Sequence, residues 1–131
     1  MQSKKEYSVV IPIYNEEENI PQLDKEIKEV MKKVSNNYEI IYINDRSTDD
    51  SLNILKKLNN IKIINLNKNY GQSTALDAGF KEARGELVIS IDGDGQNDPA
   101  DIPKMLEKLK QENLDVVAGW RKKRKDKRKG Y

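Results

Sequence analysis

Short apolar runs alternate with amphipathic stretches along most of this chain. The runs are rich in β-branched side chains and predict strands that are buried on both faces of a sheet. They cover residues 7–13, 39–44, 61–66, 87–91 and 115–118. Between them, apolar residues recur at steps of three and four, which predicts helices. These helices lie near residues 20–34, 51–58, 73–83 and 102–109.

The alternation predicts the fold class. Continuous apolar strands that alternate with helices form a mostly parallel sheet with helices on both faces. Right-handed crossovers between such strands make this a doubly wound α/β domain, whose ligands bind at the carboxyl ends of the strands. We therefore expect one domain over residues 1–120, followed by a basic, flexible tail over residues 121–131.

Composition narrows the chemistry. The 131 residues include neither Cys nor His, which excludes disulfides, thiol nucleophiles, Ser-His-Asp triads and ordinary structural zinc sites. Any bound metal is then held by oxygen, which points to magnesium, manganese or calcium.

Charge and hydropathy indicate the partners and the compartment. The tail holds eight basic residues and one acidic residue, which leaves 16 basic against 21 acidic residues in residues 1–120, a net charge of −5. We therefore expect no nucleic-acid partner for the folded part. No apolar run approaches the roughly 18–20 residues that span a bilayer. A charged stretch precedes the first run, so we expect no signal peptide and a cytoplasmic protein.

An acidic segment follows the fourth predicted strand. Asp92 and Asp94 are separated only by Gly93, which leaves room for a ligand near the backbone. Two carboxylates this close repel each other unless a divalent cation neutralises them. Mg²⁺ or Mn²⁺ fits, because such ions take one or two carboxylates together with water and substrate phosphate. Gln96 would add a neutral oxygen. A solvated acidic turn is the alternative interpretation.

Three other positions at the same edge suit a nucleotide, although each has a simpler explanation. Asp45 suits hydrogen bonds from a nucleobase or ribose, but equally a turn or a helix cap. Lys68, close to Gly71, suits a phosphate, but equally a solvated surface. Tyr14 suits stacking on a base, but an aromatic residue at a strand end also completes a core. Their convergence on one edge favours a ligand site.

Four ordered motifs resemble those of inverting family-two glycosyltransferases, which have the GT-A fold. The motifs are residues 8–16 (SVVIPIYNE), 44–49 (NDRSTD), 69–72 (NYGQ) and 92–94 (DGD), the last matching the DxD metal motif. The continuation at residues 95–99 (GQNDP) is most similar to dolichol-phosphate mannose synthases and bacterial polyprenyl-phosphate glucosyltransferases. The resemblance covers about residues 7–125.

The resemblance implies a site for a UDP- or GDP-sugar. Asp92 and Asp94 would be the catalytic residues and, with Gln96, the ligands of a Mg²⁺ or Mn²⁺ ion at the diphosphate. The sugar would pass with inversion to a polyprenyl phosphate in cell-envelope synthesis, while the ion stabilises the departing diphosphate. The implied substrate-binding residues are Pro12, Tyr14, Asn15, Glu16, Asp45, Lys68, Gly71, Asp92 and Gly93.

Three functions stay open at this point. Family members normally continue through an acceptor-binding half, so we expect this chain to be the donor half of such an enzyme. A phosphate acceptor is largely anionic at neutral pH and needs no general base. The alternatives are a catalytically silent nucleotide-sugar-binding or scaffold module, and a nucleotide-sensing domain.

The basic tail is interpreted as a solvated end or as a contact with donor phosphates or the inner face of the membrane.

Overall fold

The computed structural model describes residues 5–91, 99–111 and 116–117. The helices and strands follow in the order β1 (Lys5–Ile13), α1 (Ile20–Val34), β2 (Tyr38–Asn44), α2 (Ser51–Lys56), β3 (Lys62–Asn65), α3 (Gln72–Glu82), β4 (Gly85–Ser90), the 3₁₀ turn η1 (Pro99–Asp101), α4 (Ile102–Gln111) and β5 (Val116–Val117). Each predicted strand and helix is present, and the fifth strand is the shortest.

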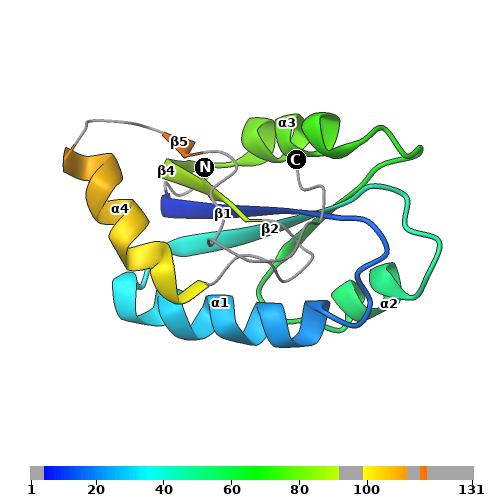
Figure 1. Ribbon diagram of the computed structural model, residues 1–131, viewed down its shortest axis with the longest axis horizontal. Coiled ribbons are helices and arrows are strands. Elements are labelled where there is room, and N and C mark those ends of the chain that lie inside the picture. The colour runs from blue at the N-terminus through cyan, green and yellow to red at the C-terminus, as the bar shows by residue number, and fades with distance from the viewer. Residues whose placement is uncertain (1–4, 92–98, 112–115, 118–131) are drawn as a thin grey trace, which may run out of the picture.

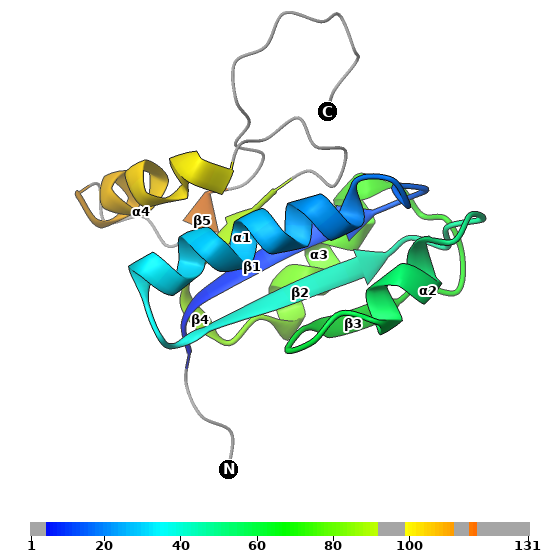
Figure 2. The same cartoon turned by 90° about the horizontal axis from the view of Figure 1, so that it is seen from below.

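The strands form one parallel sheet in the order β3-β2-β1-β4-β5 (Figures 1 and 2). The chain first builds outward from β1 through β2 to β3, and then returns to the other side of β1 for β4. The direction in which successive strands are added to the sheet therefore reverses between β1 and β4. In such sheets a ligand crevice forms at the carboxyl ends of the strands beside that point.

Helices cover both faces of the sheet, as the alternation predicts. Figure 1 shows α3 above the sheet and α1 and α2 below it, and Figure 2 shows the same layers from below. The α1 side holds the larger core, to which α1 contributes Ile20, Leu23, Ile27 and Met31, all at 3 % exposure or less. These side chains recur at steps of three and four, so one stripe of the helix is buried against the sheet.

The connection from β4 to β5 departs from the expected handedness. It steps outward across the sheet in the same direction as the connection from β3 to β4. Yet α4 packs Ile102 and Leu106 into the core on the α1 side, whereas α3 covers the opposite face. The β3–β4 and β4–β5 connections thus move in the same direction across the sheet, but α3 and α4 cross it on opposite faces. Such connections have opposite handedness, so they cannot both be right-handed.

The second core, under α3, depends on close approach of helix and sheet. The α3 face is built from small residues, and both Ala75 and Gly79 are buried. A Cβ placed on Gly79 would lie 2.4 Å from Cγ1 of Val10 and 2.7 Å from Cδ1 of Ile43. The small face of this helix is therefore required by the side chains of β1 and β2 beneath it.

We expect Gly79→Ala to destabilise the protein by about 2 kcal/mol, because the added methyl group forces the helix away from Val10 and Ile43. Helix propensity alone would favour alanine by up to about 1 kcal/mol, so the sign of the effect tests the packing. Urea unfolding measures it. Thr74→Ala, at an exposed position of the same helix, is the control, and a Gly79→Ala variant more stable than wild type would contradict the prediction.

Within the described ranges, no helix combines the length and the apolar character that crossing a bilayer requires.

Candidate functional site

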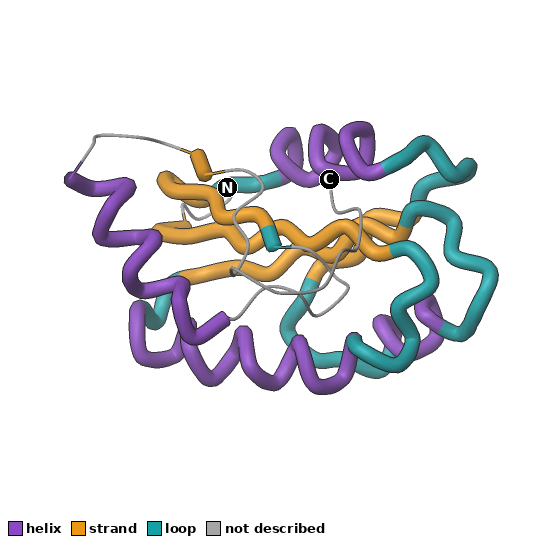
Figure 3. Tube along the Cα trace, in the orientation of Figure 1, coloured by secondary structure: helices purple, strands orange, loops and turns teal. Residues whose placement is uncertain are grey.

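The loops after β1, β2 and β3 meet at one end of the sheet, where Figure 3 shows them as teal segments beyond the strand ends. Parallel strands bring their carboxyl ends to one edge, so these loops lie side by side although the strand ends, Ile13, Asn44 and Asn65, are 31 and 21 residues apart in the chain. Hydrogen bonds between the loops, and not apolar packing, determine the local structure.

Asn15 joins the loop after β1 to the loop after β2. Its backbone is left-handed, with φ at 54°, a conformation that Asn tolerates better than most residues. Its Oδ1 accepts hydrogen bonds from the backbone N–H groups of Thr48 (2.7 Å) and Asp49 (3.2 Å). Its own N–H donates to Oγ of Ser47 at 2.9 Å. The side chain that the sequence suggested for substrate thus fastens two loops together.

The same two loops are joined again at the start of α1. The N–H of Glu16 donates to Oγ of Ser51 (2.9 Å), and the N–H of Glu17 donates to Oδ2 of Asp49 (3.2 Å). In return, the N–H of Asp50 donates to Oε1 of Glu17 at 2.8 Å. These reciprocal bonds fix the approach of the chain into α1.

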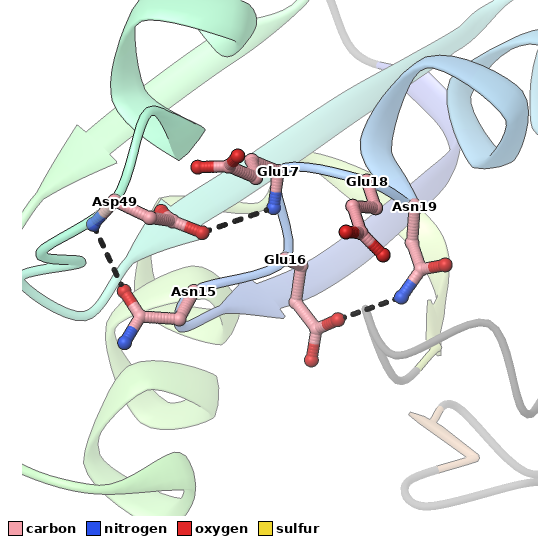
Figure 4. Close-up of a pocket in the computed structure, with 6 residues that line it drawn as sticks. All are labelled: Asn15, Glu16, Glu17, Glu18, Asn19 and Asp49. Carbon is pink, nitrogen blue, oxygen red and sulfur yellow. Dashed lines mark hydrogen bonds between the residues drawn. The ribbon is translucent and has the colours of Figure 1, made fainter.

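A shallow hollow of about 440 Å³ opens between these loops (Figure 4). Burial would raise the pKa of Asp49, but hydrogen bonds from Ser51 and Glu17 outweigh burial and hold that pKa below its ordinary value. The Asp49 carboxylate is therefore charged at neutral pH, which disfavours a diphosphate inside the hollow. Its lining residues are Asn15, Glu16, Glu17, Glu18, Asn19 and Asp49.

Asp45 joins the loop after β2 to the loop after β3. The residue is 4 % exposed, and its N–H donates to the carbonyl of Ile13 at 2.8 Å. Its Oδ1 accepts from the N–H of Tyr70 (2.8 Å), and its Oδ2 accepts from the N–H of Gly71 (2.9 Å) and Nδ2 of Asn69 (3.2 Å). The structure thus brings Asp45 and Gly71, two of the predicted site residues, into direct contact.

Two asparagines act at this edge although the sequence assigned them no role. Nδ2 of Asn44 donates to Oδ1 of Asn65 (2.8 Å), and its Oδ1 accepts from the N–H of Ser47 (3.1 Å). Nδ2 of Asn69 donates to the carbonyl of Asp45 at 3.0 Å. The available signal was their position, since Asn44 is the last residue of β2 and Asn69 lies in the loop after β3, where short amide side chains often bond to nearby backbone.

The remaining predicted site residues fall into two groups. Tyr14 is 46 % exposed at the end of β1, Lys68 is exposed, and Pro12 and Glu16 are half-buried. The other group, Asp92, Gly93, Asp94 and Gln96, lies outside the described residues. The chain leads to it from Ile91, which is buried and donates its N–H to the carbonyl of Val10 (3.0 Å). Among the residues described, no group of three or more acidic side chains could hold a metal ion.

This arrangement is that of a GT-A glycosyltransferase domain, with strands alternating with helices and loops joined at the carboxyl edge. The model of Glycosyl transferase family 2 matches residues 8–131, and the chain belongs to that family. The resemblance found in the four motifs is therefore confirmed.

Curated relatives give a finer comparison. The chain is 41% identical over 126 residues to the dodecaprenyl-phosphate galacturonate synthase of Rhizobium johnstonii, covering 92% of this chain and 37% of the relative. It is 44% identical over 124 residues to the undecaprenyl-phosphate 4-deoxy-4-formamido-L-arabinose transferase of Proteus mirabilis, covering 91% and 38%. The chain thus spans little more than a third of the length of these relatives.

Solved structures share the fold. The Staphylococcus aureus protein TarS, residues 1–349, superposes with a TM-score of 0.62 at 25% identity, covering 82% of this chain and 33% of that one. The mannosyltransferase PcManGT from Pyrobaculum calidifontis, solved with GDP-Man and Mn²⁺, superposes with the same TM-score at 18% identity and the same coverage. At that identity the second likeness concerns the fold alone.

Proposed function

We propose that this chain is the donor-binding part of a transferase that moves a sugar from a UDP- or GDP-sugar to a polyprenyl phosphate. The observation that carries the proposal is the set of joined loops after β1, β2 and β3. The loop after β1 stands at the strand-order reversal, beside β4, which leads to Asp92 and Asp94. The loop after β2 is bonded to it, and the loop after β3 is bonded to the loop after β2. The names of the two bacterial relatives, both polyprenyl-phosphate enzymes, support the acceptor class.

In this proposal the donor nucleotide lies across the carboxyl edge, with its diphosphate outside the acidic hollow. Tyr14 offers an exposed ring for the base, and Lys68 offers a positive charge for the phosphates. Gly71, at φ 101°, lets the backbone approach the nucleotide, since no side chain projects there. Pro12, Asn15, Glu16, Asp45 and Gly93 complete the set of donor-binding residues.

The residues fit a hard divalent cation. Asp92 and Asp94 provide two carboxylates and Gln96 a neutral oxygen, the donor set that Mg²⁺ and Mn²⁺ prefer in proteins. When bound, such an ion supplies positive charge that stabilises the negative charge of the departing diphosphate. Asp92 and Asp94 thus act catalytically by holding that charge in place.

The transfer is a single displacement. An oxygen of the acceptor phosphate forms the new bond to the anomeric carbon, the bond from that carbon to the diphosphate breaks, and its electron pair leaves with the diphosphate. Attack from the opposite side inverts the anomeric centre. Because a phosphate monoester with a second pKa near 6 is already anionic at neutral pH, this chain need not provide a general base. A lipid acceptor places the reaction at the inner face of the membrane, where the basic residues 121–129 suit anionic lipid.

We expect Asp94→Asn to weaken the Mn²⁺-dependent binding of a nucleotide sugar at least tenfold while circular dichroism stays unchanged, because one charged ligand of the ion is lost. Calorimetry with UDP-glucose and GDP-mannose, each with and without Mn²⁺, measures the effect and identifies the base. Asp77→Asn, on the exposed side of α3, is the matched control. Equal affinity of Asp94→Asn and wild type would contradict the metal assignment.

A second candidate function is a silent nucleotide-sugar-binding or scaffold module. Transfer of radiolabelled sugar to a polyprenyl phosphate separates the two functions. Donor binding without labelled lipid would favour the silent module.

A further inference from the structure

We propose that Asp45 is a positioning residue, which clamps residues 67–71 against the end of β2 and so places Lys68 at the donor edge. The inference rests on the proposed function for the ligand, but the clamp itself is a property of the chain. It assigns to Asp45 an action through the loop, in addition to any contact with a base.

Three donors from one short loop converge on this carboxylate. Oδ1 accepts the N–H of Tyr70 at 2.8 Å, and Oδ2 accepts the N–H of Gly71 at 2.9 Å and Nδ2 of Asn69 at 3.2 Å. The same Nδ2 also donates to the backbone carbonyl of Asp45 at 3.0 Å. Hydrogen bonds to an ionised acceptor are about twice as strong as neutral ones, and at 4 % exposure little water competes for Asp45.

Apolar burial does not hold this loop. Asn67, Lys68, Asn69 and Tyr70 are all exposed, Tyr70 at 49 %. The Tyr70 hydroxyl donates to Oδ1 of Asn67 at 2.9 Å, which closes the loop on itself and does not attach it to the sheet. Since the side chains of the loop provide little packing, the bonds to Asp45 are what fix its place.

The clamp also governs where α3 begins. Gly71 has φ 101°, a conformation that an L-residue with a side chain rarely adopts, and its carbonyl accepts the N–H of Ala75 at 3.1 Å. The N–H of the same residue is bound by Asp45. The carboxylate therefore fixes both the end of the loop and the first turn of the helix.

Asp45→Asn replaces one acceptor oxygen with an NH₂ group that faces N–H donors. We expect the amide hydrogens of Tyr70 and Gly71 to exchange at least tenfold faster in this variant, because their acceptor is lost. Asn69→Ala, which leaves Asp45 intact but removes two bonds of the clamp, should act in the same direction and remains informative if Asp45→Asn folds poorly. Asp50→Asn in the neighbouring loop is the control.

Nucleotide affinity then tests positioning against a merely structural role. Lys68→Ala should weaken binding of UDP or GDP with Mn²⁺ about fivefold in the wild-type background. It should weaken binding less than twofold in the Asn69→Ala background, because a released loop no longer places the lysine. A purely structural role would lower the melting temperature of Asn69→Ala and leave the effect of Lys68→Ala unchanged.

The outcomes separate the two proposals. Unchanged exchange at Tyr70 and Gly71 in both clamp variants would overturn the clamp. Faster exchange combined with additive effects of Asn69→Ala and Lys68→Ala would overturn its positioning role. If the wild-type chain binds neither UDP nor GDP, with or without Mn²⁺, the proposed donor function fails, whereas the exchange experiment still decides whether Asp45 clamps the loop.

Discussion

Gly85→Ala should lower the stability of this domain by about 3 kcal/mol, the largest effect we expect from a single added methyl group. A Cβ at this position would lie 2.5 Å from the backbone N of Ser8 and 2.6 Å from the carbonyl carbon of Tyr7. Gly85 is paired with Lys5 at the start of the β1–β4 ladder, and its N–H donates to Oγ of Ser8 at 2.8 Å. Because backbone atoms and not a side-chain tip block the methyl group, the strands themselves must move apart.

Thermal and urea unfolding measure this effect, and a loss of about 3 kcal/mol corresponds to roughly 10 °C in Tm for a chain of this size. Glu86→Ala, at the exposed neighbouring position, is the matched control. Removing the Ser8 hydroxyl as well, in Gly85→Ala combined with Ser8→Ala, should not restore stability, since the backbone clash remains. Recovery in that double variant would show that the hydroxyl alone was the obstacle.

The two ends of the sheet are held together in different ways. At the amino ends of the strands, Gly85, Ser8 and Glu39 pack backbone and charge so closely that the strand register is fixed. At the carboxyl ends, exposed loops are joined by polar side chains such as Asn15 and Asp45. A rigid base therefore supports a set of loops that a ligand can reach, as is usual in open α/β sheets.

The sequence was sufficient for the fold because apolar periodicity is a local signal. The strand predicted at residues 39–44 is Tyr38–Asn44, and the helix predicted at residues 20–34 is Ile20–Val34. The handedness of the β4–β5 connection, which contains α4, was predicted wrongly. The face of the sheet that a helix covers depends on which core its side chains complete. The strand and helix pattern alone does not specify that choice.

The joining of the loops could not be predicted, for a different physical reason. The bonds of Asn15 and Asp45 run between residues that are 24 to 34 positions apart in the chain. They also depend on left-handed backbone at Asn15 and Arg46, with φ at 54° and 60°. Residue type indicated a polar edge, but whether a given carboxylate faces a ligand or a neighbouring loop is decided by those turns.

A last prediction concerns the buried carboxylate at the opposite end of the sheet. Oε2 of Glu39 accepts the hydroxyl of Ser8 at 2.5 Å and the N–H of Arg84 at 2.6 Å, and Oγ of Ser8 accepts the N–H of Gly85 at 2.8 Å. Nζ of Lys62 lies 3.3 Å from Oε1. We expect Glu39→Gln to cost about 2 kcal/mol at pH 7, because the amide loses the charge that these donors face.

The pH dependence of that loss identifies its cause. Burial would raise the pKa of Glu39, but the hydrogen bonds from Ser8 and Arg84 and the charge of Lys62 outweigh burial and hold the pKa below its ordinary value of 4.5. The contribution of Glu39 to stability is therefore complete above about pH 4.5 and is lost as the pH falls through the lowered folded pKa.

Urea unfolding of wild type and Glu39→Gln should give a difference in the free energy of unfolding that shrinks between pH 6 and about pH 3. Glu86→Gln, at an exposed position of β4, should show only a small difference at each pH. If the difference in unfolding free energy between Glu39→Gln and wild type stayed constant with pH, the loss would come from poor packing of the glutamine. The charge of Glu39 would then contribute nothing.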